Sequence, residues 1–218
     1  MKKAKKNVKI QVPRFPEEMF LVENTMRVIE DEQQINASII TDCSFDARSA
    51  ESVCLKETII RNTTFQDGTF RRADIEDVRF ENCDMSNLDL SNATFNRVEF
   101  LDCKLLGSNL SEASLRHVSI GRCNAGYANF RFSHWNGVSI EESSLCFADF
   151  QLSSFTAVRL TNTDLRECQM SGLKLDGIDI SSCNISGLGV RIEDLKGALV
   201  SPQQAILLSR LMGLIIKQ

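Results

Sequence analysis

The chain has 218 residues, a formal net charge of −4 and 25% charged residues. Its length and even composition fit one structural domain with two end segments, and no apolar run is long enough to span a bilayer. The initial Met-Lys-Lys-Ala-Lys-Lys is not followed by the apolar core of a signal peptide, so we expect a cytoplasmic protein without a membrane partner.

Residues 1–34 are expected to form an N-terminal arm and cap. Five lysines between Lys2 and Lys9 make the arm basic, which is typical of a solvated tail. No nucleic-acid-reading motif accompanies them, so direct nucleic acid binding is not expected. The segment from Phe15 to Val22 contains enough apolar residues to cover the first turn of the structure that follows.

Residues 35–200 carry an unbroken five-residue pattern, because every fifth residue from Ile35 to Val200 is apolar. Five is neither the 3.6-residue period of a helix nor the two-residue period of a strand, so the pattern indicates a repeat architecture. We expect all multiples of five from 40 to 190 to face inward.

A second inward set lies two residues before each of these positions, and its members resemble one another in steps of twenty. One such column contains Cys43, Cys83, Cys103, Cys123 and Cys183, and another begins with Arg48. This spacing predicts turns of four pentads with a square cross-section, in which large and small inward residues fill the interior. About eight turns stacked at about 4.8 Å would give a rod about 38 Å long.

Several pentads, among them Ala128-Asn129-Phe130 and Ala148-Asp149-Phe150, resemble the A(D/N)LXX units of pentapeptide-repeat proteins. The resemblance covers about residues 35–200. It implies an all-β, right-handed quadrilateral β-helix, and the right hand comes from the resemblance alone.

Catalytic and metal-binding patterns are missing from the sequence. His117 and His134 have no Ser or Cys partner at a spacing that suggests a triad, and no phosphate-binding loop or metal-ligand cluster occurs. The cysteines of the inward column are expected to be buried, reduced fillers. We therefore expect a binding protein without a cofactor or metal, and no enzyme.

The sequence of residues 201–218 predicts a C-terminal helix that caps the rod and provides the interface of a homodimer. Ser201 stands at the N-cap position, Pro202 at the first helical position and Gln204 at the capping-box position, while Gly213 ends the helix. Leu214 to Ile216 would form a short strand-like tail. The surplus of apolar side chains predicts a dimer interface made by Leu207, Leu208, Leu211, Met212, Leu214 and Ile215.

The segment from Glu193 to Leu211 also resembles the ending of Qnr-type quinolone-resistance pentapeptide proteins. The unbroken register matches the loop-free members of that group. The resemblance implies dimerisation through this end and DNA mimicry on a type II topoisomerase, DNA gyrase or topoisomerase IV, with protection from quinolones as a further expectation.

Charge is distributed unevenly along and around the predicted rod. Residues 35–200 contain 16 basic and 23 acidic residues, a net charge of −7. Two adjacent sides carry 12 acids and 6 bases, whereas the other two carry 11 and 10. The predicted DNA-mimic face comprises Asp67, Glu81, Asp84, Glu99, Asp102, Glu141, Glu142 and Asp179.

A generic scaffold for an unknown protein partner is the alternative function. An outward apolar series with two flanking arginines favours it, because aromatic residues and arginine are enriched at interface centres. This contact patch would contain Arg122, Tyr127, Arg131, Phe132, Phe147 and Leu152.

Overall fold

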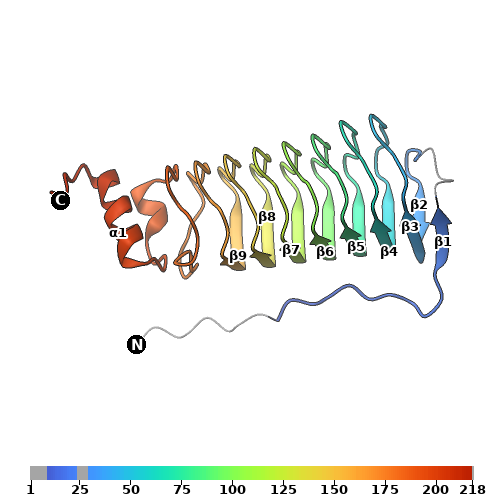
Figure 1. Ribbon diagram of the computed structural model, residues 1–218, viewed down its shortest axis with the longest axis horizontal. Helices are drawn as coiled ribbons and strands as arrows, with labels where there is room; N and C mark the ends of the chain where they lie inside the picture. The colour runs from blue at the N-terminus through green and yellow to red at the C-terminus, as the bar shows by residue number, and fades with distance from the viewer. Residues whose placement is uncertain (1–8, 24–28, 218) are drawn as a thin grey trace.

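The computed structural model describes residues 9–23 and 29–217, which form an elongated rod with the chain wound around its long axis (Figure 1). All strand pairs between named strands are parallel. The strands are β1 (Phe20–Glu23), β2 (Gln34–Asn36), β3 (Ser38–Thr41), β4 (Cys54–Arg61), β5 (Asp74–Glu81), β6 (Thr94–Leu101), β7 (Ser114–Gly121), β8 (His134–Glu141) and β9 (Ser154–Thr161). The helices are a 3-10 helix (Ile192–Leu195), α1 (Pro202–Ser209) and a second 3-10 helix (Arg210–Met212).

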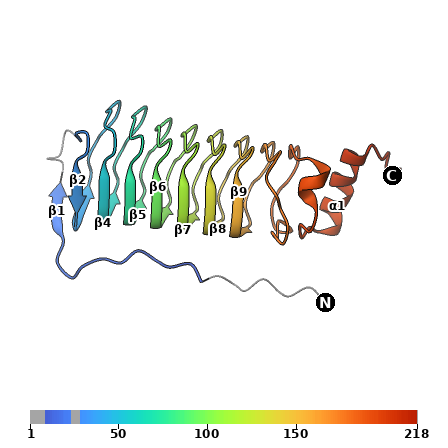
Figure 2. The ribbon, with the colours of Figure 1, turned by 180° about the vertical axis from the view of Figure 1, so that it is seen from behind.

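The twenty-residue turn is confirmed by the strand register. Val78 is the Cα partner of Val98, which in turn is the partner of Val118. Strands β3 to β9 stack in chain order along the rod (Figures 1 and 2). After β9 the same spacing continues as isolated bridges such as Asp164–Asn184. The described residues thus form a right-handed quadrilateral β-helix, with seven strand-bearing turns and one further turn without a strand.

The four sides of the rod differ in backbone structure. The eight-residue strands β4 to β9 cover two adjacent sides, and each is interrupted at one corner residue, such as Asp77, that the register skips. The other two sides are joined from turn to turn by single bridges, such as Asp84–Lys104 and Asp89–Asn109. The sequence pattern did not distinguish these two kinds of side.

Every corner of the square uses left-handed backbone. The residue two positions after an inward residue has a positive φ along most of the rod, for example 57° at Asn87 and 60° at Asn92. This conformation costs a residue other than glycine about 1 kcal/mol or more. Turn-to-turn hydrogen bonds offset that cost, because the Asn87 N–H donates to the Leu106 carbonyl at 2.8 Å. Corner side chains consequently project outward.

The interior matches the predicted register closely. All multiples of five from 40 to 190 are buried except Phe155, which is half-buried against the core. The Trp135 indole N–H donates to Ser133 Oγ at 2.7 Å, so the one tryptophan is buried without an unpaired donor. Arg48 is exposed and was wrongly placed among the inward residues, since a buried guanidinium would need a charged partner.

The cysteine column is buried as expected, and hydrogen bonding explains its composition. Cys103 Sγ donates to the carbonyl of Leu101, two residues earlier, at 3.2 Å. Thr63 and Ser143, which occupy the same column, donate in the same way at 2.8 Å. The column therefore requires a small side chain with a donor. Outside this column, burial raises the pKa of the Cys168 thiol to about 12, which keeps this sulfur unreactive.

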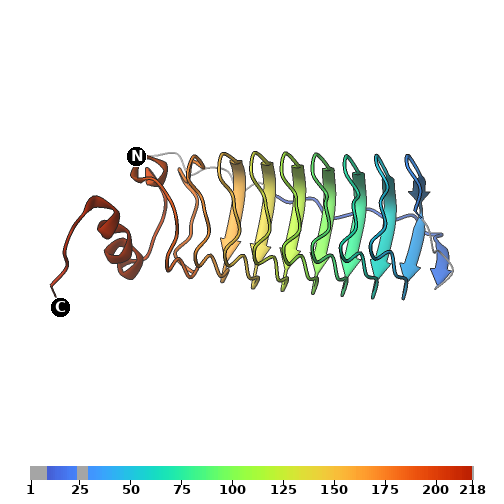
Figure 3. The ribbon, with the colours of Figure 1, turned by 90° about the horizontal axis from the view of Figure 1, so that it is seen from above.

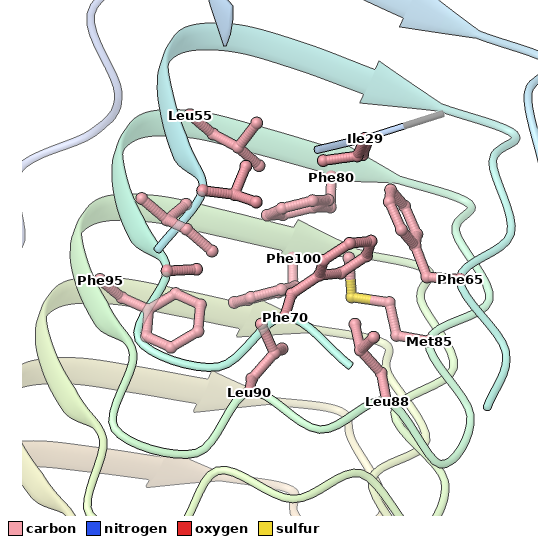
Figure 4. Close-up of a pocket in the computed structure, with 13 residues that line it drawn as sticks. Ile29, Leu55, Phe65, Phe70, Phe80, Met85, Leu88, Leu90, Phe95 and Phe100 are labelled. Atoms are coloured by element: carbon pink, nitrogen blue, oxygen red, sulfur yellow. The ribbon is translucent and has the colours of Figure 1, made fainter. Parts of the chain in front are cut away.

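One small cavity lies in the core near the N-terminal end of the rod (Figure 4). Its volume is about 30 Å³ and its lining is entirely apolar, with Phe65, Phe70 and Leu88 among the contributors. A buried water needs at least two polar partners, so the cavity is dry. It is also far below the roughly 300 Å³ of a small-molecule site, and we regard it as a packing defect.

The N-terminal end is covered differently from the expectation. Strand β1 adds to β3 and places Val22 opposite Ile40, while Ile29 is buried against the first turns. Phe15 does not cover the first turn but lies beside Arg79 of β5. Phe20 and Leu21 are exposed. The described residues of 1–34 thus cover this end with a strand and the buried side chain of Ile29, and residues 1–8 and 24–28 lie outside the described part.

The C-terminal end is closed by Asp194 and Gln204. Asp194 is almost fully buried and accepts hydrogen bonds from the Gly172 N–H, Lys174 Nζ and Arg191 Nε at 2.7–2.8 Å. Burial alone would raise the pKa of Asp194, but these donors outweigh it and hold the pKa well below its usual range.

Helix α1 follows beyond the last turn (Figure 3). Ser201 and Gln204 form the predicted capping box, and Gln204 Nε2 donates to the carbonyls of Ile180 and Cys183 at 2.8 Å. Gly213 ends the helical segment with a φ of 76°. Residues 214–217 form no strand, because the chain brings no strand edge to them, so the predicted strand-like tail is wrong.

The register predicts how the rod responds to a buried charge. Phe100→Asp places an unpaired carboxylate in the core, which should cost at least about 3 kcal/mol and lower the melting temperature by about 6–12 °C. Ser114→Asp is the matched control, because Ser114 is exposed beside a buried position. Thermal unfolding followed by circular dichroism measures both variants, and equal melting temperatures would contradict the register.

The Asp194 network predicts a pH dependence of stability. Because the pKa is lower in the folded chain than the unfolded value of about 3.9, Asp194 stabilises the fold fully above that value. The stabilisation is lost as the pH falls through the folded pKa. Asp194→Asn should destabilise the protein by about 2–3 kcal/mol at pH 7 and flatten the loss below pH 4. Urea unfolding at several pH values measures this, with Glu193→Gln as the exposed neighbouring control. Parallel pH profiles for wild type and Asp194→Asn would argue against the network.

Candidate protein-interaction surfaces

The predicted acidic face is built from corner and strand residues of two adjacent sides. Asp67, Asp102 and Glu142 are corner residues with φ values of 54°, 55° and 49°. Glu81 and Glu141 end strands β5 and β8. Their outward placement follows from the backbone, since alternate residues of a strand and all corner residues point away from the core.

Four of the eight carboxylates form ion pairs with basic residues twenty positions away. Stacked turns place such residues side by side, so opposite charges at this spacing meet. The pairs are Arg61–Glu81 at 2.5 Å, Arg79–Glu99 at 2.7 Å, Lys104–Asp84 at 3.2 Å and Arg122–Asp102 at 2.8 Å. Half of the predicted face is therefore neutralised locally.

The pKa values of three of the eight carboxyl groups are lowered. The hydrogen bond from Arg122 lowers the pKa of Asp102, and hydrogen bonds from Ser181 lower that of Asp179. Burial alone would raise the pKa of Asp84, but bonds from Ser86 and Lys104 outweigh it and lower the value. These groups stay ionised at neutral pH, yet Asp84 and Asp102 share their charge with a cation.

Three other carboxylates of the predicted face are more available to a binding partner. Glu141 accepts a hydrogen bond from Ser139 Oγ at 2.9 Å, and Asp67 accepts one from Asn87 Nδ2 at 2.9 Å. Glu142 is exposed at its corner. Within residues 9–23 and 29–217, none of these three has an ion-pair partner. Glu141 and Glu142 are consecutive and form the densest unpaired negative charge of the predicted face.

The sequence analysis did not identify the basic partners Arg61, Arg79 and Lys104, which determine how much negative charge the predicted face keeps. The sequence does contain a signal for these ion pairs, because each basic residue lies twenty residues from the carboxylate that it neutralises. The net charge of a side does not show where charge remains, because that depends on the ion pairs along the side.

The predicted aromatic patch is partly assembled by the structure. The Tyr127 and Phe147 rings stack with centroids 4.9 Å apart, and the Arg131 guanidinium lies 5.5 Å from the Phe132 ring centre. Tyr127 is 63% exposed. The four apolar members are all corner residues, and they flank the side that contains Phe130 and Phe150: Tyr127, Phe132, Phe147 and Leu152. Arg122 lies on a different corner and pairs with Asp102.

The C-terminal end exposes several large apolar side chains. Leu208 is half-buried against the core of its own rod, so it packs α1 onto the end of the rod. The other five residues of the predicted interface are exposed, and Ile206 and Ile216 extend the same surface. This C-terminal apolar surface comprises Ile206, Leu207, Leu211, Met212, Leu214, Ile215 and Ile216.

The described residues contain no group of three or more His, Cys, Asp or Glu side chains placed to hold a metal ion. His134 Nδ1 lies 2.8 Å from Ser154 Oγ. The spacing of these two residues in the sequence did not suggest a catalytic pair. The contact joins two exposed residues in successive turns, and no carboxylate bonds to the other ring nitrogen in the described part. No helix there is long and apolar enough to cross a membrane.

Comparisons with known proteins agree on the repeat. Three family models match: "Pentapeptide repeats (9 copies)" over residues 51–94, "Pentapeptide repeat region" over 73–150 and "Pentapeptide repeats (8 copies)" over 148–187. A comparison with curated protein sequences gives no match.

Solved structures similar to this chain include pentapeptide-repeat proteins of several kinds. Full-length QnrB1, a plasmid-mediated fluoroquinolone resistance protein, is 16% identical over 89% of this chain and 95% of its own, with a TM-score of 0.34. HetL, involved in heterocyst differentiation regulation in the cyanobacterium Nostoc, is 16% identical over 78% and 90%, with a TM-score of 0.33. A protein of the Arabidopsis thaliana thylakoid lumen is 15% identical over 61% and 72%, with a TM-score of 0.19.

With TM-scores below 0.5, these structures carry no functional argument, and the assignment rests on the repeats. The family models together span residues 51–187, and the five-residue register and the twenty-residue turn continue on both sides of that range. The chain belongs to the pentapeptide-repeat family.

Proposed function

We propose that this protein is a non-enzymatic cytoplasmic homodimer that binds a type II topoisomerase, DNA gyrase or topoisomerase IV, as a DNA mimic and relieves quinolone action on it. The observation that carries a binding function is the filled rod: inward positions are occupied by side chains, and the core cavity has only about 30 Å³. Small-molecule and catalytic sites are concave pockets, and the filled core of this rod offers none.

The choice of a topoisomerase is supported by the resemblance of residues 193–211 to the ending of Qnr-type proteins and by the rod shape. Charge magnitude limits how mimicry can work. Duplex DNA carries one charge per about 1.7 Å, so a 38 Å length carries about 22 charges, against a net of −7 for residues 35–200. Recognition must therefore depend on individually placed carboxylates, of which Glu141 and Glu142 are the best exposed pair.

Dimerisation is supported by the C-terminal apolar surface. Ile215 is 95% exposed, Met212 65% and Leu214 54%. A monomer would leave these side chains in water at the end of a rod whose remaining corners are mostly polar. A second copy related by a two-fold axis would cover them with the identical surface, and would give a continuous rod of about twice the length.

The dimer interface predicts the effect of charges on α1 and the residues after it. Leu207→Glu combined with Leu211→Glu should halve the mass measured by light scattering, because both side chains are exposed on the rod and covered only in a dimer. The β-type circular dichroism should stay unchanged. Gln203→Glu, which adds one charge to the same helix at an exposed position, is the control. A wild-type monomer at micromolar concentration would rule out this interface.

Topoisomerase binding predicts a specific charge dependence. Glu141→Lys with Glu142→Lys should abolish binding to purified gyrase or topoisomerase IV, because a DNA-binding surface is basic. Binding of the wild type should weaken with rising salt and compete with linear duplex DNA. The measurements are direct binding, supercoiling or decatenation, and the same reactions with a quinolone present.

Asp74→Lys with Glu112→Lys is the matched control for this experiment. Both carboxylates are exposed, carry no ion pair among the described residues, and lie on the opposite part of the square. Asp77 is unsuitable as a control, because it is buried and paired with Arg97. Equal loss of binding in both double variants would show that net charge, and not the Glu141–Glu142 corner, determines recognition.

A generic protein-interaction scaffold is the second candidate, and the stacked Tyr127–Phe147 pair favours it. Stacked rings on adjacent turns stabilise a sheet, but these two rings leave a large fraction of their surface in water. If the wild type neither binds nor affects either topoisomerase, this candidate stands, and Tyr127, Phe132 and Phe147 become the residues to substitute.

A further inference from the structure

Residues 9–19 lie lengthwise along the rod. The segment precedes β1 in the chain. From β1, at the N-terminal end of the rod, it extends alongside the turns in the direction of α1, passing β5 and reaching β7 (Figures 1 and 2). In a solenoid each turn normally contacts only its neighbours. From here on, the arm means residues 9–19 only. The arm contacts two turns of the rod that are not adjacent to each other.

Three contacts and one buried side chain hold the arm. The Arg14 N–H donates to Asp77 Oδ1 at 3.0 Å, and the Arg79 guanidinium lies 5.4 Å from the Phe15 ring centre. Gln11 Nε2 and His117 Nε2 are 3.3 Å apart. Pro13 is buried although it belongs to no helix or strand. The part of the rod beneath the arm, which we call the arm surface, thus offers the Asp77 carboxylate as an acceptor, the Arg79 cation and the His117 imidazole. It also buries Pro13.

The spacing of the arm matches the spacing of the rod. Asp77 and His117 are corner residues of one edge and lie two turns apart, about 9.6 Å at 4.8 Å per turn. Their contacts on the arm, Arg14 and Gln11, are three residues apart. Three residues of polyproline II helix rise about 9.3 Å and complete one helical turn. A polyproline II segment therefore presents the same side to this edge at every second turn of the rod.

The arm sequence favours that conformation. Pro13 and Pro16 are also three residues apart, and each fixes its own φ near −65°. Proline also keeps the residue before it extended, which applies to Val12 and Phe15. The Pro-Arg-Phe-Pro segment is thereby prepared for an extended contact with little loss of conformational entropy.

The surface beneath the arm is fixed by contacts within the rod. Arg97 donates to both oxygens of Asp77 at 2.7 and 2.6 Å, and to Glu76 at 2.6 Å. Burial alone would raise the pKa of Asp77, but Arg97 and the Arg14 N–H outweigh it and lower the pKa. Since Arg97 and Glu76 belong to the rod, the Asp77 acceptor keeps its orientation without the arm.

The arm itself is held weakly. Among the described residues, positions 9–19 make no backbone–backbone hydrogen bond to the rod, and the first such bond runs from the Phe20 N–H to the Ala37 carbonyl at 2.8 Å. Val12 is 61% exposed, and Arg14 and Glu17 are exposed. A segment with few buried contacts belongs to the least stable part of a fold, so it can leave while the rod stays intact.

We propose that the edge formed by Asp77, Arg97 and His117, with Arg79 beside it, is a binding surface for an extended peptide of the Pro-x-x-Pro type with an aromatic residue before the second proline. Residues 9–19 are its displaceable occupant within the chain, and a partner segment of the same chemistry replaces them. Arg79 also pairs with Glu99 of the predicted acidic face, so this surface adjoins the proposed topoisomerase contact, whereas Asp77 and His117 belong to the peptide surface alone.

A peptide exchange experiment tests the proposal with the full chain. The arm-release variant carries Pro13→Asp and Phe15→Ala, and faster trypsin cleavage after Arg14 confirms release. The probe is a fluorescent synthetic peptide, Lys-Ile-Gln-Val-Pro-Arg-Phe-Pro-Glu-Glu-Met, measured by anisotropy. It should bind the release variant at least tenfold more tightly than wild type, whose own arm competes at an effective concentration of about 1 mM.

Two controls make the result specific. A peptide with the Asp and Ala replacements should not bind the release variant, and adding Asp77→Asn to that variant should weaken binding of the original peptide at least tenfold. Circular dichroism confirms that each rod is folded. Absence of peptide binding to a folded release variant would overturn the proposal, as would equal binding to wild type and to the release variant.

Discussion

Turn-to-turn backbone hydrogen bonding in a fixed twenty-residue register is the constraint on which the whole molecule depends. Inward residues at multiples of five donate their N–H groups to carbonyls of the next turn, as Phe65 does to Asp84 and Met85 to Lys104, both at 2.7 Å. No insertion interrupts this register between Ile40 and Val190. Turn-to-turn bonds also support left-handed backbone at the corners, where residues such as Phe132 and Phe147 would otherwise be unfavourable.

The same constraint determines which surfaces can act. Residues twenty apart are neighbours, so charges at this spacing neutralise each other, as Arg79 and Glu99 do. Corner residues point outward and most of them are exposed, as Glu142 and Tyr127 are, whereas Asp77 is buried and paired with Arg97. The candidate interaction surfaces therefore lie at corners and ends: the Glu141–Glu142 pair, the aromatic patch, the arm surface and the C-terminal apolar surface.

The five-residue periodicity was sufficient to predict the inward register and the square turn, because burial of every fifth side chain requires an apolar residue there. The capped helix followed instead from the Ser201–Gln204 capping residues. Arg48 was misplaced, since its position in the first turn reaches solvent. The corner conformation left no signal, as Tyr127, Arg122 and Asn87 share it without sharing chemistry. The position of the arm could not be predicted either, because Asp77 and His117 become one surface only after the turns stack.

The register itself can be tested by nuclear Overhauser effects between methyl groups. Val78, Val98, Val118 and Val138 are fully buried partners in successive strands, so their methyl groups should be stacked at about 4.8 Å per turn. In a protein labelled at valine methyls, Val98 should show cross-peaks to both Val78 and Val118, and Val118 to Val138. Absence of these cross-peaks, or strong contacts from Val98 to residues at other separations, would contradict the twenty-residue turn.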